Sequence, residues 1–310
     1  MEAKLEIMNL LQNKQLLENE LKSLAYGSVE IRENESNKYI YVHYREDGVA
    51  LTKYVGEYSN ELYNLVLNNS IKAKELKKQI REINKKLKQL NYIEEDLSEK
   101  VEQNIDFAKR HLVDTIYKQA ILEGVATTFA DTESIIEGGK VNNMTSEDIM
   151  KIVNLKHAWE FILNKNVILS NTNFTLLCEI NKMVEEGFYY SAGKVRNVPV
   201  TIGGTTWKPN LPIDSVIKEE LEKIFNDEMD DIDRAIELLL YTMKKQVFID
   251  GNKRTSVIFC NHYLISKGKG IISIPAELTA KFKDLLISYY EGKDEKQIKK
   301  FIKEKCYMGI

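Results

Sequence analysis

The stretch that decides the fold is KKQVFIDGNKRTSVIF, residues 244–259, where an apolar turn leads into Asp-Gly-Asn-Lys-Arg and a helical pattern follows. Gly251 permits backbone angles and a close approach that a side chain would prevent. Asn252 is a typical N-cap residue, so we expect a helix that begins there with free backbone amides. Because the N-terminus of a helix attracts anions, the stretch predicts a phosphate-binding site.

The charged side chains of this stretch fit a nucleotide better than a bare phosphate. Lys253 and Arg254 add full positive charges, and Arg254 can bind two phosphate oxygens at once. Asp250 would repel a bare phosphate, but its carboxylate suits a Mg²⁺ ion that bridges two phosphates. The stretch alone is equally compatible with an ordinary capped helix in which Asp250 and Arg254 pair. Gln246 stands where a base would be expected, and an amide cannot accept a proton.

The same stretch resembles the signature of the Fic (Fido) family, His-Pro-Phe-x-Asp-Gly-Asn-Lys/Gly-Arg. Residues 173–187, NFTLLCEINKMVEEG, resemble the helix before the family's flap, and residues 193–212 resemble the flap itself. Residues 133–162 resemble the family's inhibitory helix and the connection that follows it. The resemblance covers about residues 120–300. It implies a mainly α protein, a Fido-type helical bundle with a β-hairpin flap.

The resemblance also implies an activity and its site. Fic enzymes typically transfer AMP from ATP to a Ser, Thr or Tyr hydroxyl of a protein, whereas the related Doc toxins transfer the γ-phosphate. The expected cofactors are ATP, or another nucleoside triphosphate, and Mg²⁺. The catalytic positions would be Gln246, Asp250, Asn252 and Arg254, with Gly251, Asn252, Lys253 and Arg254 at the nucleotide and Asp250 at the metal. A protein target would dock on the flap by strand addition at Val198, Val200, Ile202 and Thr206.

Two departures from the family pattern change this expectation. The histidine that serves the family as base is replaced by Gln246, and the proline after it by Val247. Loss of a general base typically costs about 10²- to 10⁴-fold in rate, while positioning and the anion site rest on other residues. Val257 stands where relatives often carry a second arginine. We therefore expect weakened or altered AMP transfer; the alternatives are an inactive nucleotide-binding regulator and a Doc-like phosphotransferase.

A third feature is Glu137, in an inhibitory-helix-like segment at about residues 125–140. In the family, a glutamate from such a helix reaches the motif arginine and blocks the γ-phosphate. The resemblance therefore implies a contact between Glu137 and Arg254. A carboxylate is disfavoured at a helix C-terminus, which an arginine partner would explain. The alternative is an ordinary helix that ends at Gly138-Gly139.

The N-terminal third has a different pattern. Residues 1–24 place leucines on one helical face, and residues 71–90 repeat apolar side chains at three- and four-residue steps, as in an antiparallel helix pair. Between them, SVEIRE, KYIYVHYR and VALTKYV predict three strands, with turns at 34–37 and 47–48. We expect residues 1–98 to form a helical hairpin with a small antiparallel β-meander, and residues 99–310 to form the Fic domain.

From residue 100 onward most of the chain shows helical periodicity. We expect helices near 101–124, 145–164, 171–187, 213–226, 230–246 and 252–267, and one or two more within 276–305. Residues 195–208 are the exception, because β-branched residues alternate on both sides of Gly203-Gly204. This pattern predicts a two-strand hairpin.

A third functional hypothesis concerns nucleic acid. Residues 71–90 hold eight Lys and Arg against two Glu, and such a helix can follow phosphates. Tyrosines of the strands could stack on bases: Tyr39, Tyr41, Tyr44 and Tyr54. The commoner explanations are a solvated face of a helix pair and packing of the tyrosines against the helices. The net charge of −3 gives no general attraction to nucleic acid or to anionic membranes.

Composition sets the remaining bounds. A chain of 310 residues with 43% hydrophobic and 29% charged residues can bury a sizeable core, in one large domain or two smaller ones. No apolar run approaches the roughly 18 residues of a membrane span. Three scattered cysteines cannot form a disulfide framework, and the N-terminus lacks the pattern of a cleavable signal. We expect a cytoplasmic protein with buried thiols, and the sequence leaves a homo-oligomer open.

Overall fold

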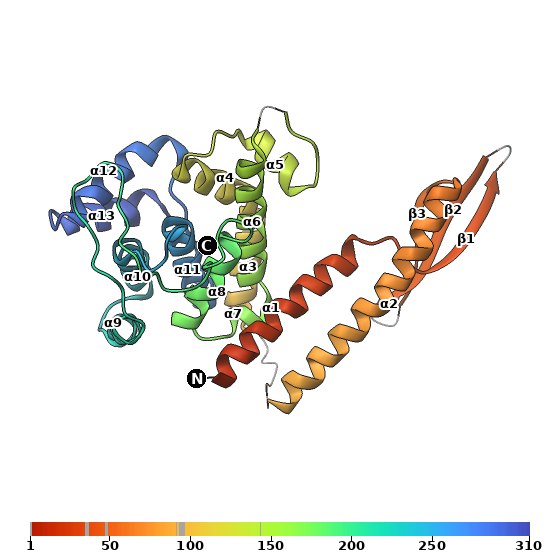
Figure 1. Ribbon diagram of the computed structural model, residues 1–310, viewed down its shortest axis with the longest axis horizontal. Coiled ribbons are helices and arrows are strands. Elements are labelled where there is room, and N and C mark those ends of the chain that lie inside the picture. The colour runs from red at the N-terminus through yellow and green to blue at the C-terminus, as the bar shows by residue number, and fades with distance from the viewer. Residues whose placement is uncertain (1, 35–36, 47–48, 91, 93–96, 143) are drawn as a thin grey trace. The chain divides into compact units, whose positions relative to one another are not determined.

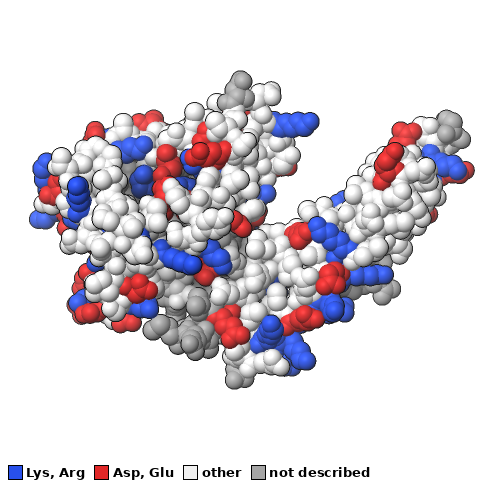
Figure 2. Space-filling view, in the orientation of Figure 1, with Lys and Arg blue, Asp and Glu red and all other residues white. Residues whose placement is uncertain are grey.

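The computed structural model describes residues 2–34, 37–46, 49–90, 92, 97–142 and 144–310. The chain divides into two compact units, Met1–Glu94 and Glu95–Ile310. The expected boundary after residue 98 falls just inside the second unit. Lys and Arg side chains are interspersed with Asp and Glu over the face drawn in Figure 2, as the small net charge leads one to expect.

The first unit is a helical hairpin that carries a three-stranded sheet. Its elements are α1 (Glu2–Ser23), β1 (Ser28–Asn34), β2 (Asn37–Glu46), β3 (Val49–Glu57) and α2 (Asn60–Gln89). The strands pair antiparallel in the order β1-β2-β3, which confirms the predicted meander. The central residues of its turns, 35–36 and 47–48, lie outside the described residues. Helix α2 begins at Asn60, earlier than expected, because Ser59 caps it by accepting the N–H of Leu62.

The sheet of this unit has two different faces. Ile40 and Val42 are fully buried with Val66 of α2 in a small apolar core. Because side chains alternate along a strand, Tyr39 and Tyr41 lie on the opposite face, where both rings contact Tyr54 at centroid distances of 6.2 and 5.4 Å. Tyr54 is 53% exposed. Packing against the helices therefore does not account for these tyrosines.

The regular secondary structure of the second unit is mainly helical, with a long non-helical segment between α8 and α9 (Figure 1). Its helices are α3 (Glu99–Arg110), α4 (Leu112–Glu123), α5 (Phe129–Ile136), α6 (Ser146–Ile162), α7 (Lys165–Ile168), α8 (Phe174–Val184), α9 (Asp214–Asn226), α10 (Asp231–Lys245), α11 (Asn252–Ser266), the short 3₁₀ helix η1 (Ala276–Leu278), α12 (Thr279–Tyr290) and α13 (Glu295–Lys305). The expected helix 101–124 is two helices that break at His111, whose ring bonds the carbonyl of Phe107. Two strands of two residues each, β4 (Ile271–Ile272) and β5 (Tyr307–Met308), were not expected; they pair antiparallel.

Helix α11 forms the centre of this unit. It is buried on all sides and packs against α10, α8, α6, α4 and α3. Polar side chains are buried along it as well as apolar ones: Asn252, Arg254, Thr255, Ser256, Asn261 and His262. Its His262 is fully buried between the Thr172 hydroxyl, at 2.8 Å, and the Val167 carbonyl, at 2.9 Å. Burial lowers the pKa of His262 to about 4. His262 is thus a packed residue of the core.

The flap is the main correction to the expected fold. Residues 195–212 contain a turn at Gly203-Gly204 but no β-strand, so the predicted hairpin was wrong. Pro199 and Pro209, one in each arm, have no N–H to donate to a ladder. The buried guanidinium of Arg196 instead joins the two arms by donating to the carbonyls of Val198 and Asn210, each at 2.8 Å.

Two further findings concern the chain as described. None of its helices is both long and apolar enough to span a membrane. All three cysteines are free thiols; Cys260 and Cys306 are buried and Cys178 is partly buried.

Candidate functional site

The motif loop joins α10 to α11. Helix α10 ends at Lys245, and Gln246 follows in the left-handed conformation with φ of 47°. Gly251, with φ of 72°, is the N-cap of α11, so the helix begins at Asn252 as expected but Asn252 is not its cap. The side chain of Asn252 instead fastens the loop: its Oδ1 accepts the N–H of Phe248 at 3.0 Å, and its Nδ2 donates to the carbonyl of Phe248 at 2.9 Å.

The first turn of α11 presents free donors. The N–H of Thr255 bonds the carbonyl of Gly251 at 2.8 Å and starts the helical pattern. The amides before it, at residues 252–254, donate to no acceptor within the described part of the chain. Such N–H groups at the start of a helix can bind an anion.

A cavity of about 320 Å³ lies beside these amides. It is bounded by the motif loop, the flap, α12 and the end of α4. Its lining residues are Glu123, Val200, Thr201, Ile202, Gly203, Gln246, Ile249, Asp250, Asn252, Lys253, Lys283, Leu286, Ile287 and Tyr290. The size and the mixture of an apolar wall with a few charged groups are typical of small-molecule sites.

The tip of the flap is held against α12. Thr205 donates from its hydroxyl to the Glu291 carboxylate at 2.7 Å, and the Trp207 ring stacks on Tyr290 at a centroid distance of 5.4 Å. A Cβ atom on Gly204 would lie 2.8 Å from Cδ1 of Ile287, so the turn touches the helix closely. These contacts close one side of the cavity.

The four flap residues expected to dock a target do not share one environment. Val200 and Ile202 line the cavity, whereas Val198 is 46% exposed and Thr206 is also exposed. The flap forms no strand, so the role of these residues in strand addition stays a prediction.

Gln246 lines the cavity, but its amide is already engaged. Its Nε2 donates to the carbonyl of Met243 at 2.7 Å, and its Oε1 accepts from Nδ2 of Asn252 at 3.3 Å. Both ends of the amide therefore stabilise the left-handed turn after α10. This geometry gives Gln246 a structural role at the position where the family has a base.

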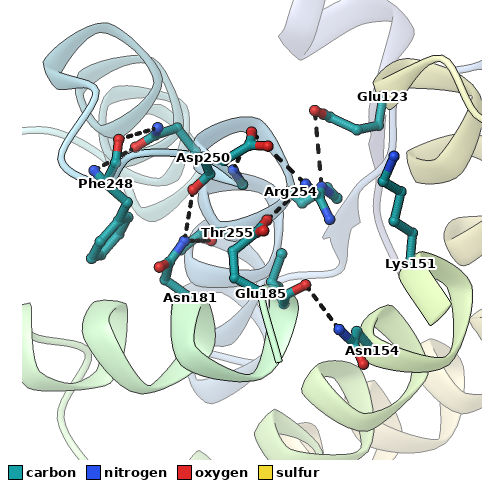
Figure 3. Close-up of polar contacts among 12 residues, drawn as sticks. Glu123, Lys151, Asn154, Asn181, Glu185, Phe248, Asp250, Arg254 and Thr255 are labelled. Carbon is teal, nitrogen blue, oxygen red and sulfur yellow. Dashed lines mark hydrogen bonds and ion pairs between the residues drawn. The ribbon is translucent and has the colours of Figure 1, made fainter. Parts of the chain in front are cut away.

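Arg254 lies beneath the first turn of α11 among three carboxylates (Figure 3). Its Nη2 is 2.7 Å from Oε1 of Glu185 and 3.9 Å from Oδ1 of Asp250, and its Nε is 3.9 Å from Oε1 of Glu123. The side chain is only 2% exposed. Arg254 does not line the cavity beside the free amides of α11.

The expected contact between Glu137 and Arg254 is absent from the described ion pairs, and this expectation was wrong. Glu137 is exposed at the C-terminal end of α5. Glu185, the C-cap of α8, takes the arginine instead. Its carboxylate also lies against Gly251, where a Cβ atom would be 2.3 Å from Oε1 of Glu185. A larger residue than glycine at 251 would thus collide with this carboxylate.

The electrostatics of this cluster are unusual. Burial raises the pKa of Glu185 to about 7; Arg254 opposes this rise, whereas Asp250 and Glu123 add to it. Several buried polar atoms have no hydrogen-bond partner among the described residues: Arg254 Nε and Nη1, Glu123 Oε2 and Glu185 Oε1. The Arg254–Glu185 pair is therefore close but poorly aligned for a hydrogen bond.

Asp250 is the candidate metal ligand. Its carboxylate is 47% exposed, and Oδ1 accepts the N–H of Gly251 at 2.7 Å. Within the described residues, no group of three His, Cys, Asp or Glu side chains is arranged to hold a metal. Mg²⁺ commonly takes one or two protein carboxylates together with substrate phosphates. Asp250 fits such an ion, which would need the nucleotide for its remaining ligands.

Several residues that shape the site were missed from the sequence: Glu123, Asn181, Glu185, Arg196 and Lys283. Asn181 illustrates why they matter. Its Nδ2 donates to the Asp250 carbonyl and to the Thr255 hydroxyl, both at 3.1 Å, and its Oδ1 accepts the N–H of Gly193 at 2.9 Å. Asn181 is one of several polar residues in the helix 174–184, so the sequence did not single it out.

Comparison with known proteins agrees with this geometry. Residues 171–264, which span α8, the flap, the motif loop and most of α11, match the model of the Fic/DOC family. No curated protein matches the chain.

Solved structures with a Fic domain share the fold. Fic-1 from C. elegans has a TM-score of 0.52 at 17% identity, covering 78% of this chain and 79% of that one. A Fic family protein from Desulfovibrio desulfuricans has a TM-score of 0.52 at 12% identity, covering 67% and 72%. A Fic domain containing signaling protein from Bacteroides thetaiotaomicron has a TM-score of 0.50 at 16% identity, covering 62% and 76%. The mainly helical Fic fold expected from the sequence is confirmed.

Proposed function

We propose that this protein binds a nucleoside triphosphate in the cavity at the start of α11 and slowly transfers its nucleotidyl group, AMP foremost, to a protein hydroxyl. The observation that carries the proposal is the cavity itself. It brings the region of the free amides of α11, Lys253, Asp250 and an apolar wall together under the flap. The flap, the motif loop and the start of α11 lie within residues 171–264, the segment that matches the Fic/DOC family. Members of this family typically transfer AMP or other nucleotide groups to proteins.

The proposed reaction is an in-line displacement. The target hydroxyl oxygen forms a bond to the α-phosphorus while the bond to the bridging oxygen breaks, and pyrophosphate leaves with the electron pair. The amides of α11 and Lys253 stabilise the negative charge on the phosphate oxygens. Bound at Asp250, Mg²⁺ would neutralise further phosphate charge. The hydroxyl proton leaves to water, because the amide of Gln246 cannot accept it.

A second candidate is a nucleotide-binding regulator that performs no transfer. The specific observation in its favour is Gln246, whose amide is hydrogen-bonded to Met243 and Asn252 and is thus not free to act on a hydroxyl. In this case the nucleotide would control the binding of a partner protein.

The test uses ATP labelled at either the α- or the γ-phosphate, with Mg²⁺. The full chain is incubated with each label, alone and with a cell extract, and nucleotide affinity is measured by calorimetry. Protein labelled from α-ATP and not from γ-ATP supports AMP transfer, and the reverse supports Doc-like phosphotransfer. Nucleotide binding without label supports the regulator. No nucleotide binding contradicts both proposals.

A matched pair of variants assigns the result to this site. Asp250→Asn removes the candidate metal ligand, whereas Asp284→Asn removes an exposed acid of α12 outside the cavity. Labelling that the first change abolishes and the second leaves intact assigns the activity to the cavity.

A further inference from the structure

We infer that Lys283 of α12 holds the phosphate chain together with Lys253, and that Arg254 is a buried counter-ion of Glu185 and not a phosphate ligand. The inference rests on the proposed nucleotide site and assigns its anion-binding residues.

The lysines face the cavity from two different helices. Of the described cations, those that line it are Lys253, at the start of α11, and Lys283, on α12. The charge of Lys253 is partly neutralised by Glu123, because its Nζ lies 3.5 Å from Oε2 of that residue. Lys283 forms no ion pair with any described carboxylate. An anion in the cavity would therefore meet one cation whose charge is not neutralised by the protein.

Helix α12 fixes the direction of Lys283. Leu286, Ile287 and Tyr290 line the same cavity, and residues three, four and seven positions apart share one face of a helix. Phe282 and Leu286 are buried and anchor α12 in the unit. The orientation of Lys283 is thus set by packing and by the flap contacts at Ile287 and Tyr290.

The alternative cation on α11 is not available. Position 257, where a second arginine would stand, holds a valine that is buried in the core. Lys283 therefore adds a second positive charge to the cavity from outside the motif, beside that of Lys253.

Arg254 is separated from the cavity by its own partners. Its guanidinium contacts Glu185, Glu123 and Asp250 and is almost wholly buried. To bind a phosphate it would have to leave the Glu185 carboxylate without its partner in a buried position, which is strongly unfavourable. Its contacts therefore suit a residue that fixes the start of α11.

The charges at the cavity also indicate the class of ligand. Lys253 and Lys283 are matched by Asp250 and Glu123, so these four groups add no net charge. A bare anion therefore gains little electrostatic binding energy in this cavity. A nucleoside di- or triphosphate that carries Mg²⁺ suits it, because the metal pairs with the acid and the phosphates pair with the lysines.

The first test compares variants of α12. Affinity for a non-hydrolysable ATP analogue with Mg²⁺ is measured by calorimetry for wild type, Lys283→Ala, Lys283→Arg and the control Lys281→Ala, an exposed lysine of the same helix. We expect Lys283→Ala to weaken binding about tenfold, as loss of one charge-assisted contact does, and the arginine variant and the control to stay near wild type. Adenosine, which has no phosphate, should bind wild type and Lys283→Ala equally, a result that a merely structural role would not give.

The second test separates Arg254 from the phosphate. The double variant Arg254→Met, Glu185→Leu removes the buried pair and leaves both lysines. We expect it to bind the analogue within about threefold of wild type, whereas loss of a true phosphate ligand would cost about tenfold or more. If circular dichroism shows that the double variant does not fold, the Lys283 series decides alone.

The outcomes distinguish failure of the proposed nucleotide binding from failure of the roles assigned to Lys283 and Arg254. Wild type that binds no nucleotide contradicts the proposed function. Wild type that binds the analogue while Lys283→Ala binds it equally well overturns this inference and leaves the proposed function standing. Loss of binding in a folded double variant likewise overturns it, because Arg254 would then be the ligand.

Discussion

Nη2 of Arg254 lies 2.7 Å from Oε1 of Glu185, and both side chains are almost completely buried. The pair links the end of α8 to the first turn of α11, and the same carboxylate packs against Gly251. The start of α11 is thus fixed by an acid from the helix that precedes the flap.

The first prediction concerns pH and Glu185→Gln. Because burial raises the pKa of Glu185 from 4.5 to about 7, the folded state binds a proton more tightly than the unfolded state does. The resulting stability is fully present below the ordinary pKa and is lost as pH rises through about 7. We expect the free energy of unfolding of Glu185→Gln to lack this loss between pH 5 and 8.

Urea unfolding at unit steps of pH measures the effect. Glu137→Gln is the control, since Glu137 is exposed and should behave as wild type. Equal pH dependence of wild type and Glu185→Gln would show that Glu185 is not the group that titrates.

The second prediction is that Gln246→His accelerates transfer. Histidine accepts protons near neutral pH and tolerates the left-handed conformation that Gln246 adopts. We expect the rate of labelling from α-labelled ATP to rise by about 10²- to 10⁴-fold. Gln246→Asn, which keeps an amide, should remain as slow as wild type; a histidine variant no faster than this control would contradict the prediction.

The third prediction is that Arg196→Lys loosens the flap. The guanidinium donates to Val198, Asn210 and, at 2.6 Å, Gln246, and a lysine cannot reach three carbonyls with the same fixed geometry. We expect faster hydrogen exchange of the amides of residues 197–208. Lys208→Ala, an exposed change in the same loop, serves as control. Unchanged exchange in Arg196→Lys would mean that the contacts with α12 are sufficient to hold the flap.

The fourth prediction is a double-mutant cycle between Gly251 and Glu185. Gly251→Ala places a methyl group 2.3 Å from Oε1 of Glu185 at a φ of 72°. We expect this change to lower the free energy of unfolding by about 2–4 kcal/mol, the sum of backbone strain and overpacking. In a Glu185→Ala background only the strain remains, about 1–2 kcal/mol. Denaturant titrations give both values, and purely additive effects would show that the two residues do not touch.

Local periodicity carried most of the fold prediction. The helices at 145–164, 230–246 and 252–267 were expected within one or two residues of their observed ends. The break at His111 was missed because the apolar pattern continues through it. The flap hairpin was wrong because alternation of β-branched residues cannot show that the Arg196 side chain, within the same segment, will bind the carbonyls of both arms.

The sequence predicted those residues of the site that lie in the one continuous motif stretch. Asp250, Asn252 and Lys253 do line one cavity, since a loop and the first turn of a helix place neighbours together. Glu185, Arg196 and Lys283 reach the site from elements far away in sequence, and no short pattern marks them. Glu137 was assigned by resemblance, but only the packing of α8 against α11 decides which carboxylate meets Arg254.

The way in which Arg196 grips the flap has an evolutionary consequence. All three of its acceptors are main-chain oxygens, which every amino acid possesses. Substitutions along that loop would therefore leave its path intact while altering the surface it offers. The flap can thus change which target proteins it binds while the cavity under it stays the same.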